Sequence, residues 1–216
     1  MTGHLQVAIP LFPRVTALAA VGPYEVLQRI PCLDVVFVGH TKGEVRTDNG
    51  ALGLAVDAAF GDVAGPDVIV FPGGIGTREL QHDPVVLDWL GRAHATSRFT
   101  TSVCTGSLVL GAAGLLRGLT ATTHWASYDA LAAHGAVPTP SRVVEHLDRR
   151  IITSAGVSSG IDMALRLVEL LVDPTAARAA QLMIEYDPQP PFDSGSLATA
   201  DAATVDRVVE YARFRD

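Results

Sequence analysis

Residues 99–108 join a β-branched run to a run of small residues, in the order Phe99-Thr100-Thr101-Ser102-Val103-Cys104-Thr105-Gly106-Ser107-Leu108. Threonine and valine favour a strand, whereas Gly106 and Ser107 allow a tight turn into a helix. Cys104 is therefore predicted to lie in the turn between a strand and a helix, an arrangement known as a nucleophile elbow. We expect free backbone N–H groups and the helix dipole to lower the pKa of this thiol and favour an accessible thiolate. The alternative is a buried structural cysteine.

Short apolar runs alternate with amphipathic segments along the rest of the chain. Strands are expected at 6–11, 35–39, 67–71 and 99–103, with hairpins at 44–56 and 142–153. Helices are expected around 85–93, 161–172 and 175–184, where apolar residues recur at three- and four-residue steps. This alternation predicts an α/β fold, and the length suits a single domain over residues 1–216.

Composition narrows the class of protein. The 216 residues carry a formal net charge of −7, and the arginines are scattered, so we expect no nucleic-acid partner. Cys32 and Cys104 cannot form a disulfide framework, and the sequence has no C-x-x-C pair typical of zinc sites. Neither a signal peptide nor an apolar run long enough to cross a membrane is evident. We therefore expect a cytoplasmic protein without a membrane partner.

A glycine-rich loop follows the strand predicted at 67–71. Its glycines, Gly73, Gly74 and Gly76, fit neither the dinucleotide-binding fingerprint nor a phosphate-binding loop. Such a loop is either a plain turn or a set of N–H groups that stabilise developing negative charge. Ligands of open α/β sheets bind at the carboxyl ends of the strands. The loop and Cys104 both follow predicted strands, so we expect them to lie together.

Other polar residues carry weaker signals. His124, beside Trp125, is either an acid, base or hydrogen-bond donor near the thiol or a packing residue. Asp48 is assigned to the turn of the first hairpin, and we find no catalytic argument for Asp48, His146 or Asp162.

Five motifs, taken together and in order, resemble the ThiJ/PfpI superfamily, and within it the isocyanide hydratase subgroup. They are Phe12-Pro13-Arg14-Val15-Thr16, Gly22-Pro23-Tyr24-Glu25-Val26, Phe71-Pro72-Gly73-Gly74, Ser102-Val103-Cys104-Thr105-Gly106 and Thr122-Thr123-His124-Trp125-Ala126. The stretch 185–193 also resembles that subgroup, so the likeness covers nearly the whole chain.

The resemblance implies a flavodoxin-like sandwich, with a mostly parallel central sheet and helices on both faces, that forms a homodimer. It implies that Cys104 adds to the terminal carbon of a small apolar isocyanide, R–N≡C, and that water then releases an N-substituted formamide. By motif position, Thr105 supplies a hydroxyl and a backbone N–H, Gly74 supplies a second N–H, and His124 lines the site less directly. No metal or organic cofactor is implied.

One position departs from the subgroup's pattern. The subgroup has an aspartate, next to the thiol, where this chain has Ala19, so the position of the acid holds a methyl group. A positioned proton donor is worth about 10²–10⁴-fold in rate. Glu25 is an imperfect substitute for the missing acid. Alternatively, Glu25 is a structural carboxylate that is buried beside the cysteine strand. Two hypotheses follow, a cysteine-dependent hydratase or lyase, and a non-catalytic or redox-sensing homodimer that uses Cys104.

Overall fold

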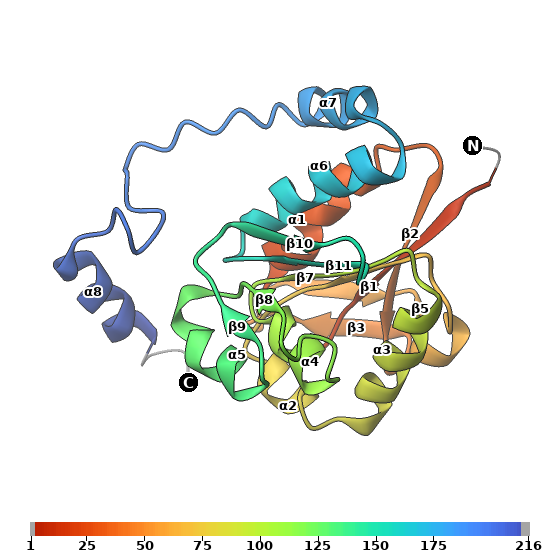
Figure 1. Ribbon diagram of the computed structural model, residues 1–216, viewed down its shortest axis with the longest axis horizontal. Coiled ribbons are helices and arrows are strands. Elements are labelled where there is room, and N and C mark those ends of the chain that lie inside the picture. The colour runs from red at the N-terminus through yellow and green to blue at the C-terminus, as the bar shows by residue number, and fades with distance from the viewer. Residues whose placement is uncertain (1–2, 213–216) are drawn as a thin grey trace. The chain divides into compact units, whose positions relative to one another are not determined.

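A seven-stranded sheet forms the centre of the first part of the chain in the computed structural model, which describes residues 3–212 (Figure 1). The strands are β1 (Leu5–Pro10), β2 (Leu33–Gly39), β5 (Ala58–Ala59), β6 (Val68–Phe71), β7 (Phe99–Val103), β10 (Val143–His146) and β11 (Ile151–Ser154). Their order is β10-β11-β7-β6-β1-β2-β5, and β10 is the antiparallel strand. The expected mostly parallel α/β sheet is thus confirmed.

Helices cover both faces of this sheet (Figure 1). They are α1 (Ala17–Leu27), α2 (Thr77–Leu80), α3 (Pro84–Thr96), α4 (Gly106–Ala112), α5 (Tyr128–Ala133), α6 (Ser159–Leu171) and α7 (Pro174–Met183), with short 3-10 turns at Phe60–Asp62 and Trp125–Ser127. On one face α1 packs against α6, and on the other α4 contacts α2, α3 and α5. Strand β6 is buried along its whole length, which explains its unbroken apolar sequence.

Local sequence explains where two of the helices begin. The side chain of Asp83 accepts hydrogen bonds from the N–H groups of Val85 and Val86, and Pro84 is the first residue of α3. Asp173 and Pro174 play the same parts at the start of α7. An aspartate cap followed by proline is a strong helix start, because proline lacks the N–H that would otherwise need a partner.

Two small sheets accompany the main one. Strands β3 (Gly43–Arg46) and β4 (Gly53–Val56) form the expected first hairpin, and β8 (Thr120–Ala121) pairs with β9 (Val137–Pro138). Beyond the end of β3, Thr47 forms an isolated bridge to Val15, which also bridges to Gly74. Residue Val15 therefore connects the hairpin to the glycine-rich loop.

The strand register brings three loops to one end of the sheet. Phe71 of β6 pairs with Ser102 of β7, and Ser154 of β11 pairs with Val103. All three strands run parallel, so the residues that follow them emerge at the same edge. This edge carries Cys104, as expected.

Contacts divide the chain into two compact units, 1–184 and 185–216. The second unit contains α8 (Ala202–Ala212), which the sequence patterns above did not predict, with an ion pair of 3.1 Å between Arg207 and Glu210. The expectation of a single domain over 1–216 stays a prediction. Over the residues that are described, no helix combines the length and the apolar character that crossing a membrane requires.

Candidate active site

Cys104 occupies a strained turn directly after β7. Its backbone φ is +56°, a left-handed conformation that residues other than glycine seldom adopt. Its N–H donates to the carbonyl oxygens of Ser154 (3.1 Å) and Ala155 (2.7 Å). Its own carbonyl accepts from the hydroxyls of Thr123 (3.0 Å) and Ser107 (3.1 Å). Surrounding backbone and hydroxyl groups thus hold the elbow in place.

The state of the thiol differs from the sequence prediction. Cys104 is 5% exposed, and burial raises the pKa of its thiol to about 11. Hydrogen bonds from the N–H and hydroxyl of Thr105 lower this pKa, and the charge of Asp48 raises it. The predicted lowering of the pKa and the expected accessible thiolate are wrong, because desolvation of the buried thiol outweighs the hydrogen bonds that lower its pKa.

The glycine-rich loop packs directly on the elbow. A Cβ atom on Gly73 would lie 2.7 Å from Cys104 Cβ and 2.7 Å from Thr105 N, so only glycine fits there. The N–H of Gly74 donates to Thr105 Oγ1 at 2.9 Å. Cys104, Thr105 and Gly74 are therefore brought together as expected. In this structure the Gly74 N–H is bonded to Thr105, and its role as a donor to a reacting group stays a prediction.

Asp48 is a residue whose proximity to the thiol the sequence interpretation missed. It lies in the turn between β3 and β4, and its N–H donates to the carbonyl of Val15 at 3.2 Å. Its Oδ1 atom is buried and has no hydrogen-bond partner among the described residues. Its carboxylate acts electrostatically on the Cys104 thiol. The turn motif gave no signal of this proximity, which depends on the bridge through Val15.

His124 lies at the start of the turn Trp125–Ser127. Its Nδ1 accepts from the N–H of Ala126 at 3.3 Å, and its ring is 5.3 Å from the Trp125 ring. Burial lowers the pKa of His124, so the ring is neutral at pH 7 with its proton on Nε2. His124 directly follows Thr123, whose hydroxyl donates to the Cys104 carbonyl, and its ring lies near Gly156, which follows the Ala155 carbonyl bonded to Cys104. The role assigned to His124 stays a prediction.

The two carboxylate positions considered from sequence do not supply an acid. Ala19 is fully buried in the first turn of α1, a helix that starts where the Thr16 N–H donates to the Gly73 carbonyl at 2.9 Å. Glu25 was expected to be buried beside the cysteine strand, and this is wrong. Its side chain is 50% exposed and pairs with Arg29 at 3.1 Å on the same helix.

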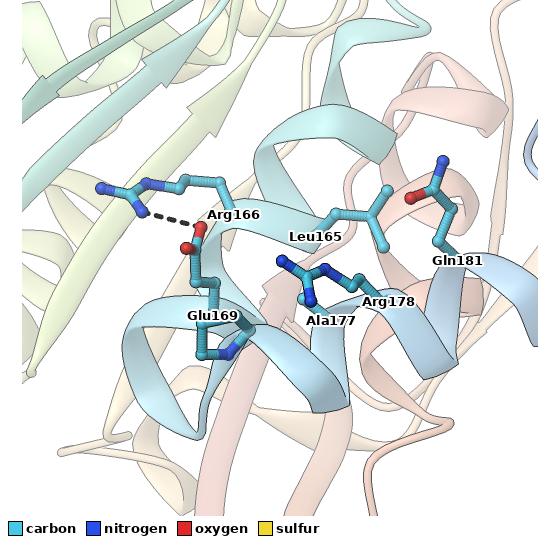
Figure 2. A pocket seen from close by; sticks show the side chains of 7 residues that line it. Leu165, Arg166, Glu169, Ala177, Arg178 and Gln181 are labelled. Carbon is cyan, nitrogen blue, oxygen red and sulfur yellow. Dashed lines mark hydrogen bonds and ion pairs between the residues drawn. The ribbon is translucent and has the colours of Figure 1, made fainter.

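A cavity of about 340 Å³ lies elsewhere, between α6 and α7 (Figure 2). Leu165, Arg166 and Glu169 line it from α6, facing Arg178 and Gln181 of α7. The elbow residues Cys104 and Thr105 and the loop residues Gly73 and Gly74 are not among the residues that line this cavity.

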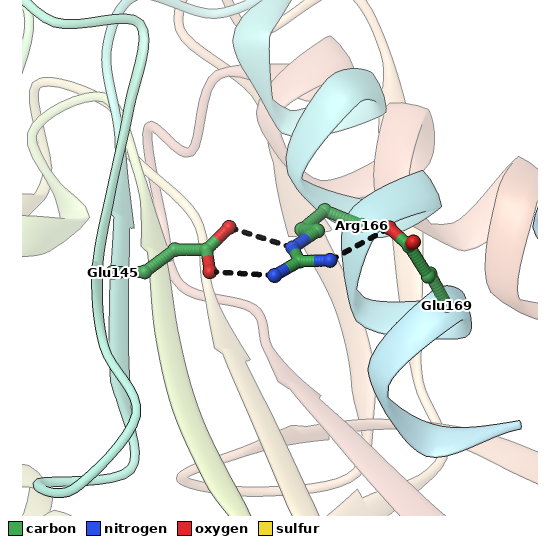
Figure 3. Close-up of polar contacts among 3 residues, drawn as sticks. All are labelled: Glu145, Arg166 and Glu169. Carbon is green, nitrogen blue, oxygen red and sulfur yellow. Dashed lines mark hydrogen bonds and ion pairs between the residues drawn. The ribbon is translucent and has the colours of Figure 1, made fainter. Parts of the chain in front are cut away.

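Arg166 also forms an ion-pair cluster at this end of α6 (Figure 3). It donates to both oxygens of Glu145 on β10, at 2.8 and 3.1 Å, and to Glu169 at 2.7 Å. These hydrogen bonds raise the pKa of Arg166. The cluster joins the antiparallel edge strand to α6. Within residues 3–212, no group of three or more histidine, cysteine or acidic side chains is placed to hold a metal ion.

A mostly parallel sheet between two helical layers, with a cysteine elbow at its carboxyl edge, defines the class of this protein. The model of the DJ-1/PfpI family matches residues 5–170, and the chain belongs to this family. The resemblance inferred from the motifs is thereby confirmed.

The chain is similar to isonitrile hydratase of Pseudomonas putida, with 46% identity over 202 residues, which are 94% of this chain and 87% of that protein. It is 30% identical over 144 residues to glutathione-independent glyoxalase DJR-1.2 of Caenorhabditis elegans, covering 66% of this chain and 75% of that one. Among solved structures, a ThiJ/PfpI family protein from Pseudomonas syringae superposes with a TM-score of 0.91 and 41% identity, covering 99% of this chain and 88% of the other.

Proposed function

We propose that this protein is a cysteine-dependent hydratase that converts an isocyanide and water into an N-substituted formamide. The observation that carries the proposal is the elbow at Cys104, held at φ +56° against the Gly73–Gly74 loop. Similarity to a protein named isonitrile hydratase, over 94% of the chain, supports the same reaction. The substrate is a small apolar molecule with an electrophilic terminal carbon.

In this reaction the sulfur of Cys104 bonds to the terminal carbon of R–N≡C. The carbon is protonated to a thioimidate, R–N=CH–S, and water replaces the sulfur to release R–NH–CHO. The thiol is neutral near pH 7, since its pKa lies at about 11. A neutral thiol is a weak nucleophile and requires an adjacent base. The hydratase therefore needs a proton acceptor near Cys104.

Formamide production from cyclohexyl or phenyl isocyanide tests the proposal. Wild-type protein is expected to exceed Cys104→Ala by at least the ~10²-fold typical of nucleophilic or acid–base groups. Formamide formation at equal rates in both proteins would overturn the proposed function. The homodimer and the cytoplasmic location, both expected from the sequence, stay predictions.

A redox-sensing role for Cys104 is the other hypothesis raised by the sequence. Oxidation of cysteine starts from an accessible thiolate. Cys104 is 5% exposed and burial raises its pKa, and both properties slow reaction with peroxide. The similarity to isonitrile hydratase over 94% of the chain supports the hydratase, and we propose that function rather than the sensor.

A further inference from the structure

We propose that Asp48 is the residue that exchanges protons with the Cys104 thiol and the substrate carbon, in place of the acid that is absent at Ala19. This inference rests on the proposed hydratase function. It begins from a requirement of the chemistry, since each turnover moves a proton off the sulfur and onto carbon. The fully buried methyl group of Ala19 cannot perform this step.

A short chain of backbone contacts places Asp48 at the site. The Asp48 N–H donates to the Val15 carbonyl at 3.2 Å, and Val15 forms an antiparallel bridge with Gly74. The Gly74 N–H donates to Thr105 Oγ1 at 2.9 Å, and Thr105 directly follows Cys104. The hairpin turn is thereby attached to the loop that packs on the elbow. The effect of the Asp48 charge on the thiol agrees with this placement.

The Asp48 side chain is also unusual in its hydrogen bonding. Among the described residues, three buried side-chain N or O atoms have no hydrogen-bond partner, namely Asp48 Oδ1, Ser102 Oγ and Thr122 Oγ1. A buried polar atom without a partner is unfavourable, and more so when it is charged. Buried polar atoms without a partner occur at catalytic positions, where the reacting group supplies the missing hydrogen-bond partner. Of the three residues, only Asp48 carries a carboxylate, the group that can take a proton from the thiol and return it to the substrate.

Other groups near the elbow are less suited to proton transfer. Thr105 offers a hydroxyl, which is not an acid or base near neutral pH. His124 uses Nδ1 to accept from Ala126, and burial lowers its pKa, so its neutral ring offers only the Nε2 proton. Glu25 is half exposed and paired with Arg29.

The proton steps balance as follows. The thiol proton moves to an Asp48 oxygen as the sulfur bonds to the terminal carbon, and Asp48 returns it to that carbon to give R–N=CH–S. Water adds to the carbon while Asp48 takes its proton and passes it to nitrogen, which gives R–NH–CH(OH)–S. The hydroxyl proton then moves through Asp48 to sulfur as the C–S bond breaks. Formamide and free thiol are released.

Two measurements on Asp48→Asn test the proposal, with Asp88→Asn as the matched control. Asp88 is exposed on α3, so its variant makes the same charge change away from the site. Hydration of cyclohexyl isocyanide is expected to slow by about 10²–10⁴-fold in Asp48→Asn and to stay unchanged in Asp88→Asn. Alkylation of Cys104 by iodoacetamide, followed across pH by peptide mass spectrometry, is expected to show a lower thiol pKa in Asp48→Asn alone.

The two measurements separate the inference from the proposed function. An unchanged hydration rate in Asp48→Asn would overturn the inference, and so would an unchanged alkylation profile. If wild type makes no more formamide than Cys104→Ala, the proposed function fails. The alkylation profile then decides for Asp48, because a lowered thiol pKa supports its pairing with Cys104 and an unchanged one refutes it.

Discussion

Gly73 lies so close to Cys104 that a Cβ atom built on it would be 2.7 Å from the Cβ of the cysteine. This contact joins the loop after β6 to the elbow after β7, two segments that the parallel register brings to one edge of the sheet. The position of the sulfur therefore depends on a residue without a side chain.

We predict that Gly73→Ala displaces the elbow. The added methyl group would also lie 2.7 Å from Thr105 N, and overpacking of this kind costs about 1–3 kcal/mol. Urea unfolding should show this loss together with slower formamide production. Gly91→Ala is the control, because a methyl group on Gly91 in α3 meets nothing within 4 Å and alanine favours helix. Equal stability of Gly73→Ala and wild type would contradict the packing described here.

Thr105→Val should weaken the link between the loop and the elbow. The substitution removes the oxygen that accepts from the Gly74 N–H at 2.9 Å, which costs about 1–3 kcal/mol when the donor is left buried. It also removes a hydrogen bond that lowers the pKa of Cys104, so that pKa should rise further. Thermal unfolding and iodoacetamide alkylation measure the two effects. Thr105→Ser keeps the hydroxyl, and a Thr105→Val protein that behaves like Thr105→Ser would refute the assigned hydrogen bonds.

The raised pKa of Cys104 should make stability depend on pH. Folding raises this pKa from its ordinary value near 9 to about 11, so the folded state favours the protonated thiol. The resulting stabilisation, on the order of 3 kcal/mol, is complete below pH 9 and is lost as pH rises through 11.

Denaturant unfolding of wild type and Cys104→Ser between pH 7 and 11 measures this effect. Comparison with the serine variant cancels the titration of lysines and tyrosines elsewhere. The stability of wild type relative to the variant should fall as pH rises above 9. A constant difference across this range would show that the thiol is not desolvated.

The substitution Ala19→Asp, made in the Asp48→Asn protein, should restore the proton transfer that Asp48→Asn removes. The isocyanide hydratases that this chain resembles have an acid where this chain has Ala19. Ala19 is buried in the first turn of α1, the helix that begins where the Thr16 N–H donates to the Gly73 carbonyl. We expect Ala19→Asp to raise formamide production at least ~10-fold in the Asp48→Asn background. Kinetics of the single and double variants measure this gain. Absence of any gain would show that position 19 does not face the thiol.

Arg166→Lys changes a residue away from Cys104, and we expect it to affect stability slightly and activity not at all. The substitution removes the guanidinium group that makes two hydrogen bonds to Glu145 and one to Glu169. The Arg166 side chain is 36% exposed. At that exposure we expect a loss of about 1 kcal/mol or less, which should shrink in high salt. Formamide production should be unchanged, since the cavity between α6 and α7 lies apart from Cys104. A large loss of activity would indicate that this cavity takes part in the reaction.

Much of the fold could be predicted from sequence, because its signals are local. An apolar run marked β6, a β-branched run marked β7, and the recurrence of apolar residues over 175–184 marked α7. The family motifs also brought Thr105 and Gly74 to Cys104, as the hydrogen bond between them confirms.

The electrostatics of the site could not be predicted in the same way. Asp48 reads as a turn residue, and its proximity to Cys104 arises from the bridges of Val15 to two distant segments. Whether the pKa of the thiol is raised or lowered depends on how completely the elbow is buried, and a sequence motif does not indicate burial. Glu25 was misplaced because its orientation follows from the rotation of α1, where it pairs with Arg29.

The central claim is that Cys104 forms a covalent bond with the isocyanide carbon. Mixing wild-type protein with phenyl isocyanide, quenching within milliseconds in acid and mapping peptides by mass spectrometry tests it directly. The account predicts a mass increase equal to one isocyanide on the peptide that contains Cys104, and no adduct in Cys104→Ala. Formamide production without any adduct on Cys104, or with the adduct on Cys32, would contradict it.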